Sequence, residues 1–499
     1  MAGPFNIPLA VLTDSYKITH PFIYPEAQRM VAYGEFRQGY DKDTADTRLV
    51  FYGIRYIVEN YIAKKWTMEQ VKQASVFFKT HNAGFTAFPF PEDLFIKIVE
   101  EHDGYFPVKI EALPEGTAIH AHVPVYQITA VGEMSRLVTF LETILTMIWY
   151  PSTVATLSRR AKDLIAAAYE KSVDESDFWS LESRLHDFGF RGCTSVEQSI
   201  IGGSAHLLNF TGTDTMSAAY YAQFHLNNGN PVGNSIPASE HSVMTAFKTE
   251  QEAMEAMISN FGQGVYACVM DSYDYQRALD KVLPAVAAFK LSQGGFLVLR
   301  PDSGDIVDSV LMGLLAAEKV FGATVNHKGY KVIQGCGVIQ GDGVSFETLK
   351  RILEAVLKAG YAAQNCAFGM GGGLLQKLNR DTMSFATKLS NIVYEDGTVR
   401  DVMKHPVTDS GKISLPGVLD VVRNADGIPM VHPRADVDKP HKDNILQVVY
   451  DHGKVPSQWP TFSELKERVE KEWDNLPKAF DPIATDLNNK INEHLARGF

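Results

Sequence analysis

Residues 338–373, VIQGDGVSFETLKRILEAVLKAGYAAQNCAFGMGGG, decide the fold class. Two short apolar runs, each followed by a glycine-rich turn, flank a segment with apolar residues at every third or fourth position. That segment begins after Ser345, a favourable N-cap residue, and ends before Gly360, which suits the C′ position of a helix. Strand, turn, helix and strand in this order predict two parallel strands joined by a crossover helix.

The same unit recurs upstream of this stretch. The apolar run at 265–270 ends in Asp271-Ser-Tyr-Asp274, and the run at 296–299 ends in Arg300-Pro-Asp-Ser-Gly-Asp305, which precedes another helical pattern. Buried strands that alternate with helices predict an α/β fold with parallel strands. An irregular (β/α) barrel is the leading interpretation and an open doubly wound sheet is the alternative. Both place ligands at the carboxyl ends of the strands, where these polar turns lie.

The repeated pattern also predicts the domain organisation. We expect a barrel-like catalytic domain over residues 151–389, and a discontinuous α+β domain built from residues 1–150 and 390–499. In the first part, apolar residues from Ile119 to Val125 alternate with His120 and His122. This alternation predicts one half-buried strand with both histidines on its solvent face.

Composition excludes several classes of protein. The chain has 499 residues and a net charge of −12, without a basic block that would favour a nucleic-acid or membrane-surface partner. Its four cysteines form no C-x-x-C pair, which suits a reducing compartment. Residues 1–10 have no basic, apolar leader pattern, and the most apolar stretch, 137–150, is too short to span a bilayer. We therefore expect a cytoplasmic enzyme.

Three strand ends carry residues suited to a phosphorylated ligand. The run Gly369-Met-Gly-Gly-Gly373 lets backbone N–H groups approach a phosphate closely, although glycines can also form a plain turn. Asp342, between two glycines, suits ribose hydroxyls or a helix-entry turn. Arg300 and Asp302 form either a structural ion pair or a site for phosphate and sugar. The chain has no G-x-x-x-x-G-K-[ST] motif, which argues against a Walker-type nucleotide loop.

Eight segments taken together resemble the type II phosphoribosyltransferases, and within them the branch that acts on nicotinamide. Each segment is modest alone, but their shared order is specific. They are Thr13-Asp-Ser-Tyr-Lys17, Leu185-His-Asp-Phe-Gly-Phe-Arg-Gly192, Asn209-Phe-Thr-Gly-Thr-Asp-Thr215, Glu240-His-Ser242, Asp271-Ser-Tyr-Asp274, Arg300-Pro-Asp-Ser-Gly304, Ile339-Gln-Gly-Asp-Gly343 and Gly371-Gly-Gly-Leu-Leu-Gln-Lys377.

The resemblance implies a reaction and its partners. Phosphoribosyl pyrophosphate would transfer its phosphoribosyl group to nicotinamide, giving nicotinamide mononucleotide and pyrophosphate in NAD salvage. Mg²⁺ would accompany the pyrophosphate, and ATP would serve as a co-substrate that phosphorylates His241. The active enzyme would be a homodimer with two active sites shared between its subunits.

The resemblance also assigns roles by position. Phe188 of one subunit and Tyr16 of the other would stack on the pyridine ring, and Asp214 would hold the carboxamide. The pyrophosphate contacts would be Arg191, His241 and Arg300. The ribose and 5′-phosphate contacts would be Asp302, Gly341, Asp342, Gly371, Gly372 and Arg380, with Arg37, Lys388 and Lys404 lining the same site. Asp271 and Asp302 would lie near the metal, and with His241 and Arg300 they form the expected catalytic group.

The chemistry is consistent with this set of residues. Breaking the C1–O bond to pyrophosphate passes through an oxocarbenium-like transition state, as in glycoside cleavage. The pyridine nitrogen is already nucleophilic, so the site needs to neutralise the leaving group and position two substrates. A lone histidine such as His241 is otherwise ambiguous, and the chain has no H-E-x-x-H metal motif.

Three other interpretations stay open at this point. They are the nicotinate branch of the same family, a barrel lyase or isomerase acting on a sugar phosphate, and a non-catalytic nucleotide-binding protein. The chain also departs from the family in two places. The stretch between Arg37 and Phe51 is shorter, and a longer basic loop is reduced to Thr408-Asp-Ser-Gly-Lys412.

Overall fold

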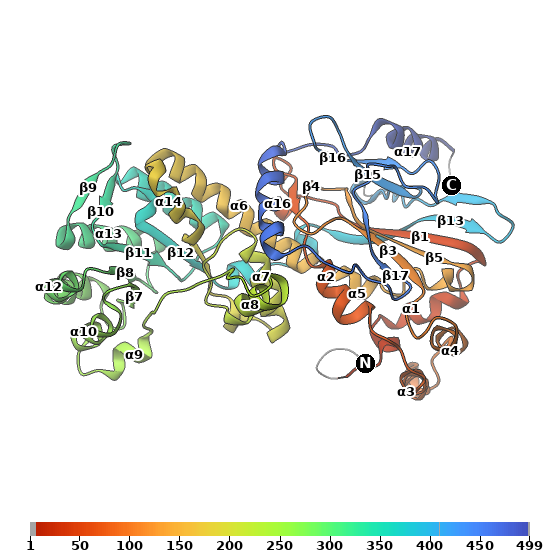
Figure 1. Ribbon diagram of the computed structural model, residues 1–499, viewed down its shortest axis with the longest axis horizontal. Coiled ribbons are helices and arrows are strands. Elements are labelled where there is room, and N and C mark those ends of the chain that lie inside the picture. The colour runs from red at the N-terminus through yellow and green to blue at the C-terminus, as the bar shows by residue number, and fades with distance from the viewer. Residues whose placement is uncertain (1–5, 409, 498–499) are drawn as a thin grey trace. The chain divides into compact units, whose positions relative to one another are not determined.

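The structure is a computed structural model that describes residues 6–408 and 410–497 (Figure 1). Residues 1–5 of the N-terminal segment and Asp409 of the shortened loop lie outside the described residues. The chain divides into two compact units. Unit 1 comprises residues 1–153, 379–460 and 464–499, and unit 2 comprises residues 154–378 and 461–463. The chain passes from unit 2 to unit 1 at 378, whereas the sequence pattern placed this change at 389.

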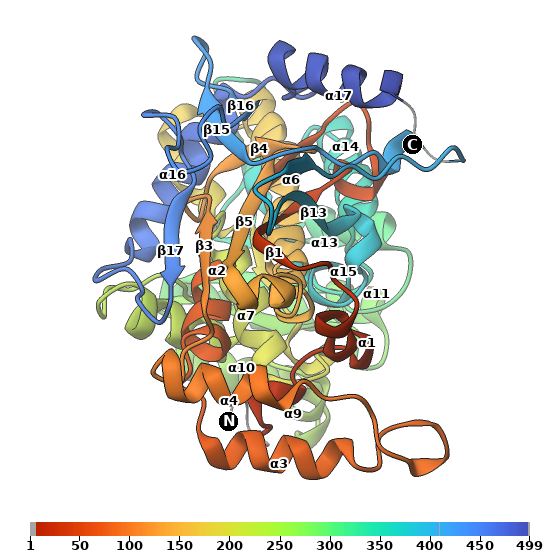
Figure 2. The same cartoon turned by 90° about the vertical axis from the view of Figure 1, so that its right-hand side faces the viewer.

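Unit 1 contains a six-stranded antiparallel sheet (Figure 2). Its strands, in spatial order, are β14 (Val399–Asp401), β13 (Phe385–Tyr394), β1 (Ala27–Phe36), β5 (Pro124–Val131), β3 (Val108–Ala112) and β17 (Gln447–Asp451). Two further strand pairs are β2 (Arg48–Val50) with β4 (Ala118–His120), and β15 (Leu419–Arg423) with β16 (Pro429–Pro433). The strand β13 explains the early boundary, because it pairs along β1 and so belongs to this sheet.

Aromatic side chains fill much of the unit 1 core. Trp66 is 3% exposed and stacks on Phe95 with 5.4 Å between ring centroids, and it also contacts Phe106. Such large side chains bury much apolar area, which stabilises the packing of helices on the sheet. The helices of this unit are α1 (Ser15–Thr19), α2 (Ile54–Ile57), α3 (Met68–Phe78), α4 (Glu92–Glu101), α5 (Glu142–Thr146), α16 (Phe462–Asn475) and α17 (Thr485–Arg497), and α6 (Trp149–Ser172) begins here.

The prediction of one continuous strand over 119–125 is wrong. Strand β4 ends at His120, β5 begins at Pro124, and His122 lies between them with a left-handed φ of 73°. His120 is fully buried, with Nδ1 2.8 Å from the Thr47 hydroxyl, and burial lowers the pKa of His120 to about 4. His122 is half-buried and faces Glu35. The alternation of apolar and polar residues in the sequence continues through the bend between β4 and β5, so it does not mark one strand. The two histidines contact polar side chains within the fold instead of the expected solvent.

Unit 2 contains a five-stranded parallel sheet, which confirms the predicted mixed α/β class. Its order is β6 (Leu185–Asp187), β12 (Cys366–Met370), β11 (Cys336–Gln340), β8 (Phe296–Arg300) and β7 (Val265–Val269). Its helices are the rest of α6, α7 (Val196–Leu207), α8 (Met216–Tyr220), α9 (His241–Ala246), α10 (Glu250–Phe261), α11 (Tyr275–Arg277), α12 (Leu283–Gln293), α13 (Ile306–Phe321), α14 (Phe346–Lys358) and α15 (Gly372–Leu375), with a hairpin of β9 (Ala323–Val325) and β10 (Lys331–Ile333).

Two irregular segments connect the edges of this sheet. Parallel bridges join Asp187 to Thr213, Gly212 to Asn234, and Ala238 to Ala267. The edge strand β6 is therefore linked through residues 212–213 and 234–238 to the other edge strand, β7. This arrangement leaves the carboxyl ends of all five strands on one side of the unit.

Local signals in unit 2 act as predicted. Ser345 accepts a hydrogen bond from the backbone N–H of Thr348 and starts α14, and Gly360 follows that helix with a φ of 83°. Asp305 caps α13 by accepting two backbone N–H bonds.

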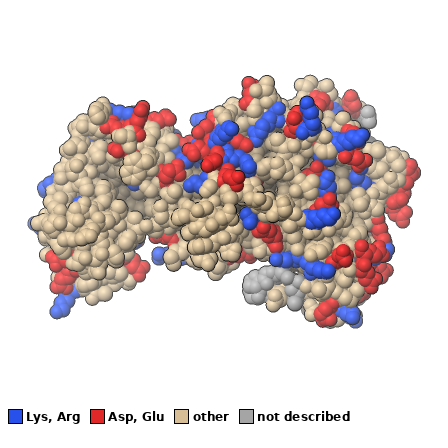
Figure 3. Space-filling view, viewed as in Figure 1, with Lys and Arg blue, Asp and Glu red and all other residues tan. Residues whose placement is uncertain are grey.

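Within the described part of the chain, no helix combines the length and apolar character that crossing a membrane requires. On the face shown in Figure 3, basic and acidic side chains are interspersed.

Candidate active site

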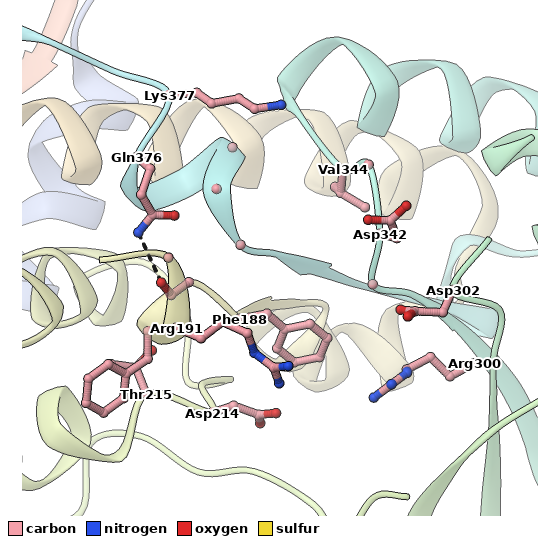
Figure 4. Close-up of a pocket in the computed structure, with 18 residues that line it drawn as sticks. Phe188, Arg191, Asp214, Thr215, Arg300, Asp302, Asp342, Val344, Gln376 and Lys377 are labelled. Carbon is pink, nitrogen blue, oxygen red and sulfur yellow. Dashed lines mark hydrogen bonds between the residues drawn. The ribbon is translucent and has the colours of Figure 1, made fainter. Parts of the chain in front are cut away.

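A cavity of about 720 Å³ lies at the carboxyl ends of the unit 2 strands (Figure 4). Its walls come from the turns that follow β6, β8, β11 and β12, together with the segment at 214–215. Nine of the residues predicted for the site line this one cavity: Phe188, Arg191, Asp214, Arg300, Asp302, Gly341, Asp342, Gly371 and Gly372. The cavity therefore lies where folds with parallel strands hold their ligands.

The glycines of the run 369–373 have distinct tasks. A Cβ at Gly369 would lie 2.0 Å from Cε2 of Phe188, so only glycine leaves room for the half-buried phenyl ring. At Gly373 a Cβ would lie 2.5 Å from the carbonyl oxygen of Val344. At Gly372, by contrast, the nearest atom would be 3.6 Å away. Gly372 is thus the position of this run where a ligand can approach the backbone, and Gly369 serves to seat Phe188.

Asp214 lies beside the phenyl ring and is held at two points. Its backbone N–H donates to the carbonyl oxygen of Asp187 at 2.9 Å, and the Ser235 hydroxyl donates to its Oδ1 at 2.5 Å. Figure 4 shows Asp214, Arg191 and Phe188 on one side of the cavity. An acceptor of this kind beside an aromatic face suits a flat ring that carries an amide.

Asp187 is a buried carboxyl group beneath this wall. Its Oδ1 accepts the Gly189 N–H at 2.7 Å. Burial raises the pKa of Asp187 to about 6, although the Gly189 N–H opposes the rise. Asp187 lies within a quoted motif but had no predicted role, because the position of a charge at a strand end does not reveal its burial.

His241, at the start of α9, adjoins two carboxylates. Its Nδ1 lies 3.0 Å from the Ser272 hydroxyl, while its Nε2 lies 3.4 Å from Asp302 Oδ2 and 3.8 Å from Asp271 Oδ1. The side chain of His241 is 44% exposed. Ser272 can fix the orientation of the ring, so that Nε2 faces the carboxylates and the solvent.

The carboxylate pair is suited to a divalent cation held jointly with a ligand. Asp271 Oδ2 accepts bonds from the backbone N–H of Asp302 and the Ser303 hydroxyl, whereas its buried Oδ1 has no hydrogen-bond partner among the described residues. No group of three or more His, Cys, Asp or Glu side chains in the described ranges is arranged to hold a metal ion by itself. Mg²⁺ commonly uses one or two carboxylates and completes its shell with phosphates and water.

Two arginines supply positive charge to the cavity. Arg300 ends β8, and its buried Nε makes no hydrogen bond with a described residue, so it is available to an anion. Arg191 is exposed in the turn after β6. Figure 4 shows Arg300, Asp302 and Asp342 on the wall opposite Asp214.

Five predicted site residues belong to unit 1 and do not line this cavity: Tyr16, Arg37, Arg380, Lys388 and Lys404. Tyr16, on α1, is 56% exposed. Arg380 is exposed in the turn before β13, and Arg37, Lys388 and Lys404 form a group of their own that is described below.

Some lining residues had no predicted role. Gln376 donates to the carbonyl oxygen of Gly189 at 3.0 Å and to Cys193 Sγ at 3.2 Å, which holds the Phe188 turn against α15. The wall also includes Thr215, Val344 and Lys377. Lys377 could have been found as a cation that closely follows a glycine run, whereas the bonds of Gln376 depend on contacts distant in sequence.

Comparisons with known proteins agree with this geometry. Residues 183–454 match the Nicotinate phosphoribosyltransferase (NAPRTase) family, and residues 8–110 match the Nicotinamide phosphoribosyltransferase, N-terminal domain. The chain is 38% identical over 462 residues to a nicotinamide phosphoribosyltransferase of Xanthomonas campestris pv. campestris, covering 90% of this chain and 96% of the relative. It is 29% identical over 498 residues to one of Acinetobacter baylyi, covering 93% and 97%.

Two solved structures share the fold. Human nicotinic acid phosphoribosyltransferase aligns with a TM-score of 0.64 at 16% identity, over 97% of this chain and 100% of that chain. Nicotinate-nucleotide pyrophosphorylase from Pyrococcus furiosus aligns with a TM-score of 0.59 at 16% identity, over 95% and 97%. With its matching family profiles and its 38% identical relative, the chain belongs to the nicotinate phosphoribosyltransferase family.

Proposed function

We propose that this protein transfers the phosphoribosyl group of phosphoribosyl pyrophosphate to nicotinamide, forming nicotinamide mononucleotide and pyrophosphate in NAD salvage. The observation that carries the proposal is that a ring-and-amide site, Phe188 with Asp214, shares one cavity with an anion site, Arg300 with Gly372. A cavity of about 720 Å³ is large enough for both substrates. The name of the relative in Xanthomonas campestris pv. campestris supports the same reaction.

Positioning and charge neutralisation drive the reaction. The pyridine nitrogen attacks C1 of the ribose while the C1–O bond to pyrophosphate breaks, and the electron pair of that bond leaves with the pyrophosphate. Arg300 and Arg191 stabilise the charge that develops on the leaving group. Phe188 holds one face of the ring, and Asp302 and Asp342 hold the ribose hydroxyls in place.

Selectivity for the amide follows from Asp214. The Ser235 hydroxyl occupies Oδ1, which leaves Oδ2 to accept a hydrogen bond from the carboxamide NH₂. Nicotinate would bring a second carboxylate to the same place, where two negative charges repel. We therefore favour nicotinamide over nicotinate as the substrate.

Asp271 and Asp302 would hold Mg²⁺ together with the pyrophosphate oxygens. When bound, the ion adds positive charge to the leaving group. The proposal extends to ATP as a co-substrate, whose γ-phosphoryl group would pass to Nε2 of His241 as ADP leaves. The exposed Nε2 and the Ser272 contact at Nδ1 support this role.

The function is tested by incubating purified protein with phosphoribosyl pyrophosphate, Mg²⁺ and nicotinamide, with and without ATP. We expect equal amounts of nicotinamide mononucleotide and pyrophosphate, and a faster reaction with ATP. His241→Ala should abolish the ATP stimulation while the protein remains folded. Failure to form the nucleotide under any condition would reject the proposal, and equal ATP dependence of variant and wild type would reject the role of His241.

We further propose a homodimer in which Tyr16 of the partner covers the other face of the pyridine ring. Exposure of Tyr16 supports this assignment. Tyr16→Ala and Asp214→Ala chains should each be nearly inactive. In a random mixture about half of the dimers are mixed, and each mixed dimer has one intact site of two, so about a quarter of full activity should return. No recovery in dimers shown to be mixed would exclude shared sites.

A further inference from the structure

Unit 1 contains a cluster of three basic residues: Arg37, Lys388 and Lys404. Burial lowers the pKa of Lys388, and the positive charges of Arg37 and Lys404 lower it further. The side chain of Arg37 is 10% exposed, and its buried Nε and Nη2 make no hydrogen bond with a residue that the structure describes. Buried donors that lack partners are costly, so this cluster is suited to an anion.

The nearest counter-ion of Arg37 is Glu35, which is fully buried. Glu35 Oε1 lies 3.6 Å from Arg37 Nε and also accepts a bond from the Tyr33 hydroxyl at 3.4 Å. Its Oε2 faces the other way and lies 3.4 Å from Nδ1 of His122. One carboxylate therefore stands between a permanent cation, Arg37, and a group that becomes cationic on protonation, His122.

His122 is held at this place by an unusual backbone conformation. Its φ of 73° lies in the left-handed region, which favours glycine and disfavours residues with a Cβ. Its N–H donates to the carbonyl oxygen of Phe36 at 2.7 Å, which fixes the turn beside Glu35. Strain of this kind persists where the surrounding structure makes use of the residue, and here the side chain that it positions is an imidazole beside a buried carboxylate.

The charges around His122 favour its protonated form. Burial lowers the pKa of His122, but the Glu35 carboxylate and, more weakly, Asp481 raise it more, against an opposing effect of Arg37. The result is a pKa above the usual value of 6.5. Besides Glu35, the cluster has the carboxylate of Glu142 near Lys388.

We propose that His122 is a pH-responsive positioning residue for the anion site of unit 1. When His122 is protonated, it forms an ion pair with Glu35 and neutralises the charge of that carboxylate. The full charge of Arg37 is then available to a phosphate-bearing ligand. When His122 is neutral, Glu35 offsets Arg37 and the cluster binds the same ligand less tightly. The inference rests on the proposed function only for the identity of the ligand, which would be a phosphate-bearing part of phosphoribosyl pyrophosphate.

Linkage provides a test that does not depend on catalysis. If protonation of His122 favours anion binding, then anion binding must favour protonation of His122 to the same extent. The full chain is titrated with inorganic pyrophosphate in a calorimeter, in two buffers of different ionisation enthalpy at about pH 7.5. The difference between the two binding enthalpies gives the number of protons taken up on binding. Comparison with His122→Asn cancels the titration of the ligand and of all other groups. Asparagine tolerates a positive φ, and His122→Gly is a second variant that removes the strain.

His452→Asn is a matched control. His452 also has a positive φ, of 46°, and pairs with a carboxylate, Asp451, at 2.6 Å. Its side chain is 43% exposed, close to the 36% of His122. Among the described ion pairs, Asp451 pairs with no arginine. Protonation of His452 should therefore not respond to anion binding.

We expect proton uptake to be smaller in both His122 variants than in the wild type and in His452→Asn. Under steady-state conditions, the KM for phosphoribosyl pyrophosphate should be about three- to tenfold higher in His122→Asn than in the wild type at pH 6 and nearly equal at pH 8.5. Equal proton uptake in the wild type and both His122 variants would overturn the inference. A protein that shows the uptake difference but forms no nucleotide would contradict the proposed function and leave this inference standing.

Discussion

The cavity of unit 2 and the basic cluster of unit 1 are built in different ways. In the cavity, turns after parallel strands shape the site, because Gly369 makes room for Phe188 and Gly372 leaves the backbone open. In the cluster, side chains of antiparallel strands and their turns meet, and Glu35 is shared by Arg37 and His122. The cavity therefore depends on main-chain geometry, which resists change, whereas the cluster depends on a charge balance that pH can shift.

The largest effect is expected at Arg300, the half-buried cation of the cavity. Arg300→Ala should lower kcat/KM for phosphoribosyl pyrophosphate by about a thousandfold, because the leaving group loses a preorganised positive charge. The exposed Arg351 on α14 gives a matched control, since Arg351→Ala removes the same charge outside the cavity. Similar kinetics for the two variants would contradict a role of Arg300 in the reaction.

A smaller effect is expected at Asp214. A substitution there tests whether the charge of this side chain, and not its shape, sets the preference of the cavity for nicotinamide over nicotinate. Two like charges about 4 Å apart repel by roughly 4 kcal/mol at an effective dielectric near 20, and solvent reduces this at the exposed Asp214. Asp214→Asn should therefore lower the preference for nicotinamide over nicotinate by about ten- to a hundredfold. Ser235→Ala keeps the charge and should change the preference much less. An unchanged preference in Asp214→Asn would show that Asp214 is not the selector.

The two glycines separate the ring site from the phosphate site. Gly369→Ala places a Cβ against Phe188 and should raise the KM for nicotinamide by about tenfold or more. Gly372→Ala makes only an ordinary contact, 3.6 Å from Gln376 Oε1, so the chain should fold normally, but the KM for phosphoribosyl pyrophosphate should rise instead. If both variants raised the same KM, the glycine run would not have the two tasks assigned to it.

The smallest effect is expected in stability at Asp187. A folded-state pKa of about 6, above the usual 3.8, means that the charged form is disfavoured by folding. The associated stability is fully present below about pH 4 and is lost as the pH rises through about 6. Asp187→Asn should thus raise the Tm by a few degrees at about pH 7.5 and have little effect near pH 4. A Tm difference that is independent of pH would contradict the raised pKa.

Much of unit 2 could be predicted because its signals are local. Ser345, Asp305 and Gly360 act within a few residues of their own positions, and the turns that follow strands mark the cavity wall directly. Nine cavity residues could be named for this reason together with the family resemblance. The task of Gly369 was different from the expected phosphate contact, because the position of the Phe188 ring depends on β6 and β12 being neighbours.

The basic cluster could not be predicted in the same way. His120 and His122 were placed on a solvent face, since alternation in sequence gives no sign that the chain bends between β4 and β5. The approach of His122 to Glu35 arises from contacts between residues distant in sequence, and so does the burial of Asp187. Features that depend on long-range contacts and on burial were therefore the ones that the sequence left undetermined.

The central claim, that the cavity selects an amide-bearing pyridine for phosphoribosyl transfer, is tested most directly by one ratio. The quantity is kcat/KM of the wild-type protein for nicotinamide divided by that for nicotinate, at saturating phosphoribosyl pyrophosphate and Mg²⁺. We expect a ratio well above one at neutral pH, because the Asp214 carboxylate attracts an amide and repels a carboxylate. A ratio at or below one would contradict it and assign the protein to nicotinate.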